Sequence, residues 1–298
     1  MDLNGMDLQI NRIEEACGGR YAVCGKLGRG AMGSAFLIKE RNADNAKYAL
    51  KVIEKNQLQN ECKDSFEIAQ QLIKLRHPSI IAIYEAREDA EYIYIRQELI
   101  EGRTLSEIRD DQSAASSLQN AAVKDWMKEI ASAISYLHVN GILHRDIKPG
   151  NIMVDRNGLA RLIDFGSARR IDSISRKRTT STICSAPYSP LERLQGKPDG
   201  IYTDIYGYGM SFYSLITGKV PQIKAEEINS LRTAGRGIKP YFMKEYNKVI
   251  TDINNIGDPE IRNLLDSCLA LDHRKRTRKY NKLYADKEKN IDEQSEQQ

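Results

Sequence analysis

The stretch from His144 to Ala168 carries polar residues whose types and spacing could bind a metal and phosphate groups. Asp146 and Asn151 fit an H-R-D-x-x-x-x-N pattern, and Asp164 begins a D-F-G triplet. Apolar residues on both sides of an intervening turn predict two short strands, which would bring Asn151 close to Asp164. Carboxylate and amide oxygens suit Mg²⁺. A merely polar hairpin is the alternative, but several matched positions at fixed spacing favour the chemical interpretation.

A glycine cluster nearer the N-terminus could approach phosphate groups. Gly28, Gly30 and Gly33 follow a G-x-G-x-x-G spacing, and glycines let backbone N–H groups come close to phosphate oxygens. The segment 34–40 is strand-like where a dinucleotide-binding fold would need a helix, so the cluster does not indicate that fold. Lys51 lies in the next predicted strand among apolar residues, and a half-buried lysine needs an anionic partner.

The elements that must position these residues change in character along the chain. Up to about residue 100 the patterns predict antiparallel strands and one helix over residues 62–76, which ends at His77. After Gly102 the character changes to a long amphipathic helix whose apolar stripe includes Trp126, and beyond residue 200 helical patterns dominate. This order predicts a sheet-rich small lobe followed by a helix-rich large lobe.

Composition argues against several classes of protein. The 298 residues carry 45 basic and 41 acidic side chains, a net charge of +4 that does not favour a nucleic-acid partner. Five scattered cysteines lack a C-x-x-C spacing and favour reduced thiols over zinc or disulfides. No apolar run approaches a membrane span, and the first residues lack a secretory signal, so we expect a cytoplasmic protein. Polar residues predict a flexible leader over 1–19 and a disordered tail over 279–298.

As an ordered set, these motifs resemble those of the eukaryotic-type (Hanks-type) Ser/Thr protein kinase family, and the KPGN and YSPLE stretches resemble its bacterial members. The resemblance runs over residues 20–278. It implies a bilobal α+β protein-kinase-like fold, with an antiparallel-sheet N-lobe at about 20–100 that holds one main helix, and a mostly helical C-lobe at about 103–278. It also implies ATP as the phosphate donor, Mg²⁺ or a substituting Mn²⁺ as the metal, and protein Ser or Thr hydroxyls as acceptors.

The resemblance assigns roles to individual residues. Asp146 would align the substrate hydroxyl, Lys148 would contact the γ-phosphate, and Lys51 would contact the α- and β-phosphates. Asn151 and Asp164 would bind the metal. The ATP-binding positions would be Leu27, Gly28, Arg29, Gly30, Ala31, Met32, Gly33, Ser34, Ala35, Ala49, Lys51, Glu98, Ile100 and Met153.

A segment with a basic run at 176–178 resembles the family's activation segment. Arg145, which precedes the catalytic aspartate, often receives a phosphate from this segment in the family. We therefore expect autophosphorylation here, with the phosphate drawing the loop onto Arg145 and placing Ser185 against Asp146. An unregulated solvated loop is the alternative. The candidate hydroxyls are those of Thr179, Thr180, Ser181 and Thr182.

Further matched positions imply a surface for a peptide substrate. Ser185 keeps the hydroxyl of the family's usual threonine, so a substrate-docking role is expected for it. Glu192 closes the activation segment and would pair with Arg276, while Asp204 would brace the catalytic loop. Glu192, Asp204 and Arg276 favour a protein substrate over the rival interpretation, a kinase-like fold that phosphorylates a small molecule.

Besides the segment around Ser185, two positions depart from the family pattern. Ala35 replaces the usual valine of the glycine-rich loop. The helix glutamate that pairs with Lys51 would fall at Ile68, whereas Glu67 lies one residue away, about 100° around the helix. Either a one-residue irregularity brings Glu67 to Lys51, or the pair is missing in the resting form. The missing pair would suit a pseudokinase that acts as a scaffold, although the intact catalytic and metal-binding positions argue against that alternative.

Overall fold

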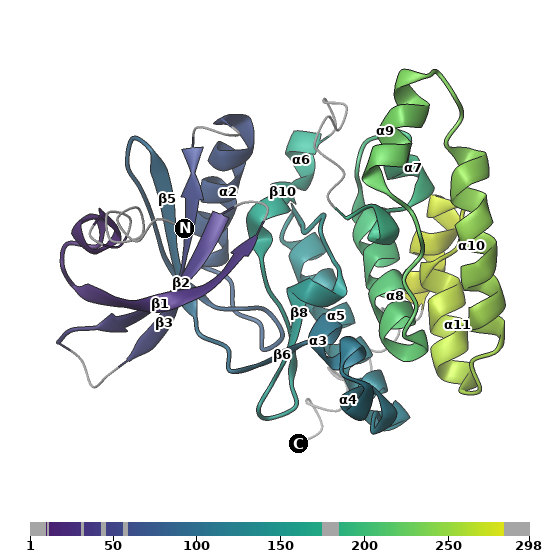
Figure 1. Ribbon diagram of the computed structural model, residues 1–298, viewed down its shortest axis with the longest axis horizontal. Helices are drawn as coiled ribbons and strands as arrows, with labels where there is room; N and C mark the ends of the chain where they lie inside the picture. Colours follow the sequence, from purple (N-terminus) through teal and green to yellow (C-terminus); the bar gives the residue numbers. More distant parts are fainter. Residues whose placement is uncertain are drawn as a thin grey trace, which may run out of the picture. The chain divides into compact units, whose positions relative to one another are not determined.

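The computed structural model describes residues 10, 12–30, 33–42, 46–55, 59–174 and 185–282. The chain divides into two compact units. One comprises Met1–Glu101 together with Phe165–Ser167, and the other comprises Gly102–Asp164 and Ala168–Gln298. The first is built on a sheet and the second on helices (Figure 1).

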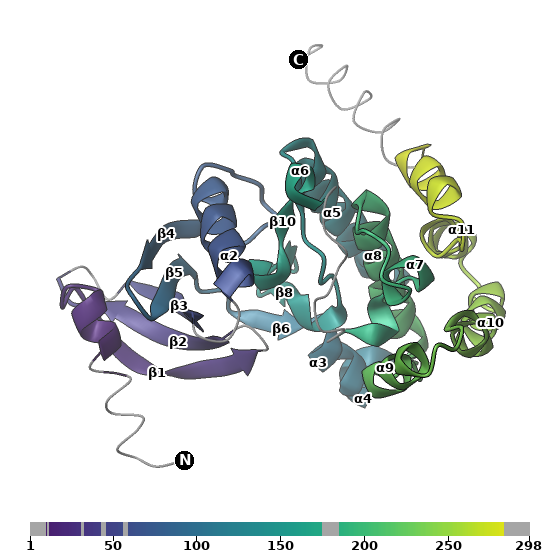
Figure 2. The same ribbon diagram turned by 90° about the horizontal axis from the view of Figure 1, so that it is seen from above.

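The first unit is built on a five-stranded antiparallel sheet in the order β1-β2-β3-β5-β4. Its strands carry apolar residues on both faces of the sheet. Leu50 and Val52 join a buried cluster on one face, while Ile53 and Ile95 point to the other. Helix α2, Gln59–Leu72, packs against β4 and β5 (Figure 2). The strands are β1 Tyr21–Gly30, β2 Gly33–Glu40, β3 Lys47–Glu54, β4 Ile83–Glu88 and β5 Tyr92–Glu98.

The segment just before the sheet is packed, which corrects part of the flexible leader expected over residues 1–19. Residues 12–16 are helical, and Ile13 is only 2% exposed within the buried cluster that also holds Leu50. Ala16 and Cys17 pack against the same cluster. These three apolar residues recur at helical spacing, so one turn of helix covers the sheet with its apolar side.

The second unit is organised around two helices, α5 (Asn120–Val139) and α8 (Ile201–Thr217). The apolar stripe predicted for α5 is confirmed, because Trp126 and the residues that follow it on that face are buried. Helix α8 is buried on most of its surface. A Cβ at Gly207 of α8 would lie 2.7 Å from the carbonyl oxygen of Ile147, so glycine allows the segment just after Asp146 to approach the helix closely.

Shorter elements complete this unit. Strands pair as β6-β8-β9 and as β7 with β10, and the β8–β9 hairpin is the one predicted between Asn151 and the D-F-G triplet. The strands are β6 Gly102–Thr104, β7 Ile142–Leu143, β8 Ile152–Asp155, β9 Ala160–Leu162 and β10 Arg169–Arg170. The other helices are α3 Leu105–Asp110, α4 Gln112–Ser116, α6 Ile171–Ile174, α7 Leu191–Leu194, α9 Ala225–Thr233, α10 Lys239–Asn254 and α11 Pro259–Cys268.

The first residues of the segment expected to be a disordered tail, 279–298, are part of a helix. Residues 273–282 are helical, and Tyr280 is 2% exposed, with its hydroxyl donating to the carbonyl oxygen of Ala131 at 3.1 Å. Burial of that aromatic ring holds the helix against α5. Residues 283–298 lie outside the described part of the chain. Within the described residues, no helix combines the length and apolarity needed to cross a bilayer.

Candidate active site

The glycine cluster lies where β1 turns back into β2 in the first unit. Gly33 has φ +147°, and a Cβ there would lie 2.1 Å from the carbonyl oxygen of Val52, so only glycine lets this hairpin pair closely with β3. A Cβ at Gly28 would meet no atom within 4 Å. Packing therefore explains the glycine at 33 but not the one at 28, where an open backbone suits the approach of a phosphate. Ala31 and Met32 lie outside the described residues.

Lys51 occupies the middle of β3, as the sequence predicted. It is half-buried and lies opposite Ala35 on β2 and Ile95 on β5. Ala49, two residues earlier on the same face, is 6% exposed. Glu98 ends β5, and its N–H donates to the carbonyl oxygen of Ala82 at 2.9 Å.

Helix α2 does not bring Glu67 into the buried face of the first unit. The helix is continuous from Gln59 to Leu72, without the one-residue irregularity that would turn Glu67 toward Lys51. Glu67 is exposed, whereas Ile68 is 1% exposed. The expected pairing of Glu67 with Lys51 is therefore wrong for this conformation, because an isoleucine takes the inward position that the family's spacing reserves for the acid.

In the second unit, three side chains converge on Asp146. Its Oδ1 accepts a 2.6 Å hydrogen bond from the hydroxyl of Ser185, and its Oδ2 lies 2.7 Å from Nζ of Lys148. The amide nitrogen of Asn151 donates to the same Oδ2 at 3.1 Å and to the Asp146 carbonyl oxygen at 2.8 Å. Nζ of Lys148 also donates to the Ser185 hydroxyl at 3.2 Å. Both carboxylate oxygens of Asp146 are thus held by hydrogen bonds to ionised or neutral donors.

Asp204 holds the loop that carries Asp146. It is 1% exposed, and its carboxylate accepts the backbone N–H groups of His144 at 2.9 Å and Arg145 at 2.7 Å. Nε2 of His138 lies 2.9 Å away. Burial alone would raise the pKa of Asp204, but the His138 contact, nearby positive charge and the Arg145 N–H together hold that pKa below its ordinary value. The carboxylate helps to hold Arg145 at φ +67°, a conformation unusual for a residue with a side chain.

Asn151 and Asp164 have the donor atoms for a divalent cation. The Asn151 side-chain nitrogen is committed to Asp146, which leaves its amide oxygen as a metal ligand. The N–H of Ile163 donates to the Asn151 carbonyl oxygen at 2.9 Å, and this bond brings Asp164 close to Asn151 along the backbone. An amide oxygen and a carboxylate fit Mg²⁺, which takes few protein ligands and keeps several waters. Met153 follows on β8 and is half-buried.

Glu192 and Arg276 form a buried ion pair in the second unit. Their N–O distance is 2.6 Å, and their side chains are 8% and 1% exposed. The Arg276 guanidinium also donates to the carbonyl oxygens of Ala270 at 3.0 Å and Tyr202 at 3.1 Å. It lies 4.9 Å from the centroid of the Tyr206 ring. The pair therefore ties α7 to α8 and to the helix over residues 273–282.

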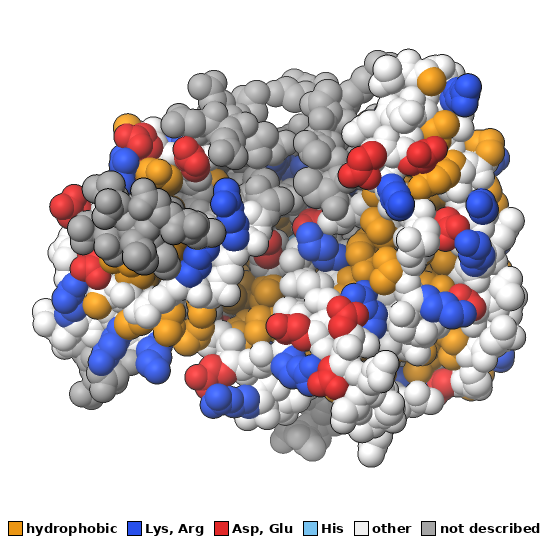
Figure 3. Space-filling model, in the orientation of Figure 1, with side chains coloured by type: hydrophobic (Ala, Val, Ile, Leu, Met, Phe, Trp, Pro, Cys, Tyr) orange, Lys and Arg blue, Asp and Glu red, His pale blue; other side chains and the backbone are white. Residues whose placement is uncertain are grey.

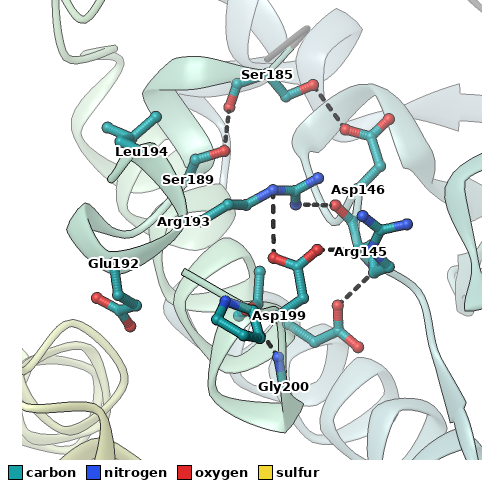
Figure 4. A network of polar contacts seen from close by, with 12 residues as sticks. Arg145, Asp146, Ser185, Ser189, Glu192, Arg193, Leu194, Asp199 and Gly200 are labelled. Carbon is teal, nitrogen blue, oxygen red and sulfur yellow. Dashed lines mark hydrogen bonds and ion pairs between the residues drawn. The ribbon is translucent and has the colours of Figure 1, made fainter. Parts of the chain in front are cut away.

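The sequence did not reveal a second ion-pair network around Arg145 (Figure 4). Nε of Arg145 lies 2.7 Å from Oδ2 of Asp199, and Nε of Arg193 lies 3.5 Å from Oδ1 of the same carboxylate. The Arg193 guanidinium also donates to the Arg145 carbonyl oxygen. Asp199 follows a proline and precedes a glycine, so it resembled a turn residue. Thr179, Thr180, Ser181 and Thr182 lie outside the described residues.

Side chains of both charge signs are interspersed on the face of the molecule shown in Figure 3. This mixture agrees with the small net charge of the sequence. Mixed charge is typical of a protein surface in contact with water.

Comparison with known proteins supports one family. The protein kinase domain model matches residues 21–285. The chain is 33% identical over 211 residues to the serine/threonine-protein kinase PrkC of Bacillus subtilis, which covers 70% of this chain and 32% of that protein. It is 28% identical over 208 residues to the probable serine/threonine-protein kinase PknB of Lactococcus lactis, which covers 68% of this chain and 32% of that protein.

A eukaryotic relative is covered more completely. The chain is 28% identical over 253 residues to a calcium/calmodulin-dependent protein kinase type 1 of Caenorhabditis briggsae, with 82% of this chain and 69% of that protein aligned. The chain thus spans about a third of the bacterial relatives it matches, and most of this one.

Proposed function

Because the chain belongs to the protein kinase family, we propose that it transfers the γ-phosphate of ATP to Ser or Thr hydroxyls of proteins. The observation that carries this proposal is the arrangement around Asp146. Its carboxylate contacts Lys148, Asn151 and Ser185 within 3.1 Å. A carboxylate fixed in this way can orient an incoming hydroxyl without reorganising during the reaction.

The transfer forms one bond and breaks one. The substrate hydroxyl oxygen bonds to the γ-phosphorus, and the bond from that phosphorus to the β–γ bridging oxygen breaks, which releases ADP. Asp146 accepts a hydrogen bond from the attacking hydroxyl and takes its proton late in the step. Lys148, which lies 2.7 Å from Asp146, stabilises charge on the transferred phosphoryl group.

Nucleotide binding is assigned to residues of the matched motifs. The backbone at Gly28 and Gly30 approaches the phosphates, Lys51 contacts the α- and β-phosphates, and the backbone of Glu98 and Ile100 contacts adenine. Asn151 and Asp164 would hold Mg²⁺. When bound, this ion supplies positive charge to the β- and γ-phosphate oxygens.

Two features favour a protein substrate and an active enzyme over the alternatives. Ser185 lies against Asp146, and the Glu192–Arg276 pair anchors the end of the segment that Ser185 belongs to. Both contacts support the proposal that this segment docks a peptide substrate. A scaffold without activity would suit the exposed Glu67, but it would not require the contacts that hold Asp146. We further propose autophosphorylation at one or more of Thr179 to Thr182, and a cytoplasmic location.

Radiolabelling tests the proposal directly. Wild-type protein incubated with [γ-³²P]ATP and Mg²⁺ should label itself and added casein, and phosphosite mapping should find phosphoserine or phosphothreonine. Asp146→Asn should bind ATP with nearly unchanged affinity in calorimetry and transfer almost no phosphate. Wild-type turnover in this variant, or label found only on a small molecule, would overturn the assignment.

A further inference from the structure

The side chain of Arg145 is nearly buried and contacts an acidic residue of its own unit. Its side chain is 9% exposed, and that of its partner Asp199 is fully buried. Nε of Arg145 and Oδ2 of Asp199 are 2.7 Å apart, which is a charge-assisted hydrogen-bond distance. A buried guanidinium needs a fixed counter-charge, because its own desolvation is costly.

The network holds Arg145 at three points. The side chain contacts Asp199, the backbone N–H donates to Asp204 at 2.7 Å, and the carbonyl oxygen accepts from Arg193. Asp199 also contacts Arg193, so one carboxylate aligns both arginines (Figure 4). The residue after Arg145 is Asp146, and so the position of the reacting carboxylate depends on this network.

The place of Asp199 in the fold fixes its carboxylate near the start of α8. It lies just before Gly200, the N-cap residue of α8. The N-terminus of a helix carries partial positive charge and stabilises a nearby carboxylate. The Asp199 carboxylate is therefore part of the folded second unit, and its position does not depend on modification of the activation segment.

We propose that Asp199 is the resident anionic partner of Arg145, and that it positions the Asp146 loop for transfer without a phosphate on the activation segment. The inference rests on the proposed kinase function and concerns its regulation. It revises the expected role of Arg145 as a phosphate receiver, because a phosphate would have to compete with a carboxylate that is already buried and bonded. Phosphates on Thr179 to Thr182 then serve some purpose other than neutralising Arg145.

The test compares two variants with wild type on casein as the added substrate. One is Asp199→Asn, which keeps the shape and removes the charge. The other replaces Thr179, Thr180, Ser181 and Thr182 together with alanine. Asp172→Asn is the matched control, since Asp172 has an 88% exposed side chain and lies 3.8 Å from Arg170.

We expect Asp199→Asn to lower kcat by about 100-fold, as a small displacement of a reacting group does, with little change in the KM for ATP. The quadruple alanine variant and Asp172→Asn should stay within about twofold of wild type in kcat. In an Arg145→Met background, Asp199→Asn should cost much less in kcat, because the two residues act as a unit. This coupling would be absent if Asp199 only supported the fold.

Two results would overturn the inference. One is wild-type kcat in Asp199→Asn, and the other is a loss in the quadruple variant as large as the loss expected for Asp199→Asn. The comparison of the quadruple alanine variant with wild type remains decisive even if Asp199→Asn fails to fold. A wild-type protein that phosphorylates neither casein nor itself would instead contradict the proposed function, so the two failures are distinguishable.

Discussion

The hydroxyl of Ser185 donates a 2.6 Å hydrogen bond to Asp146, although the two residues are 39 positions apart in the chain. Lys148 contacts both of them, at 2.7 Å from the Asp146 carboxylate and 3.2 Å from the Ser185 oxygen. The three side chains form a closed triangle that joins the catalytic loop to the segment before Glu192. The reacting carboxylate is thereby coupled to the part of the chain expected to dock the substrate.

Removing the Ser185 hydroxyl should slow transfer to a protein without weakening ATP binding. A hydrogen bond to a charged group contributes about 1.5–3 kcal/mol. Ser185→Ala should therefore lower kcat on casein by roughly 10- to 100-fold, measured by ³²P incorporation, and leave ATP affinity unchanged in calorimetry.

A conservative variant separates this role from simple packing. Ser185→Thr keeps the hydroxyl and adds a methyl group, and we expect it to retain most of the activity. An alanine variant as active as wild type would show that the contact with Asp146 has no part in transfer.

Asp204 should make the stability of the protein depend on acid pH. Its carboxylate is ionised in the folded protein with a lowered pKa, so its contribution is fully present above the unfolded pKa of about 3.9 and is lost as pH falls through the folded value. Asp204→Asn should destabilise the fold by about 3 kcal/mol at pH 7. The gap between variant and wild type in urea unfolding should shrink as pH falls below about 4. A gap that stays constant from pH 7 to pH 3 would contradict this account.

The sequence predicted those parts of the site whose residues are close together in the chain. Asp146 and Asn151 lie in one motif, and the short β8–β9 hairpin brings Asp164 next to them, so local spacing was sufficient. Glu67 was misplaced because a one-residue offset rotates a helical side chain by about 100°. Asp199 was not recognised, because it belongs to none of the matched motifs and its partner Arg145 is 54 positions away. The Glu192–Arg276 pair spans 84 positions but was expected, because both residues match family positions.

The Glu192–Arg276 pair should be costly to break on one side. Removing one member of a buried pair leaves an uncompensated charge, typically at a cost of about 3–5 kcal/mol. Arg276→Met should lower the free energy of unfolding by that amount, measured in urea. Lys279→Met is the matched control, since Lys279 pairs with Asp266 at 2.7 Å with side chains 35% and 58% exposed, and should cost no more than about 1 kcal/mol. The double variant Arg276→Met, Glu192→Gln should recover part of the lost free energy of unfolding, because neither charge is then left unpaired. If it recovered none, the ion pair would not be the source of the loss.

Ile13 provides a test of whether the segment before the sheet belongs to the folded unit. It is 2% exposed in the cluster with Leu50 and Val52, and the preceding Arg12 pairs with Glu91 at 2.7 Å. Truncating a buried isoleucine to alanine costs about 2–5 kcal/mol, through lost transfer energy and the cavity left behind. Ile13→Ala should therefore lower the free energy of unfolding by an amount in that range. Glu15→Ala, at an exposed position of the same helical turn, should change it by less than about 0.5 kcal/mol. If both variants unfolded at the same urea concentration as wild type, residues 12–17 would be a loose leader after all, and the sheet would be stable without the apolar side of this helix.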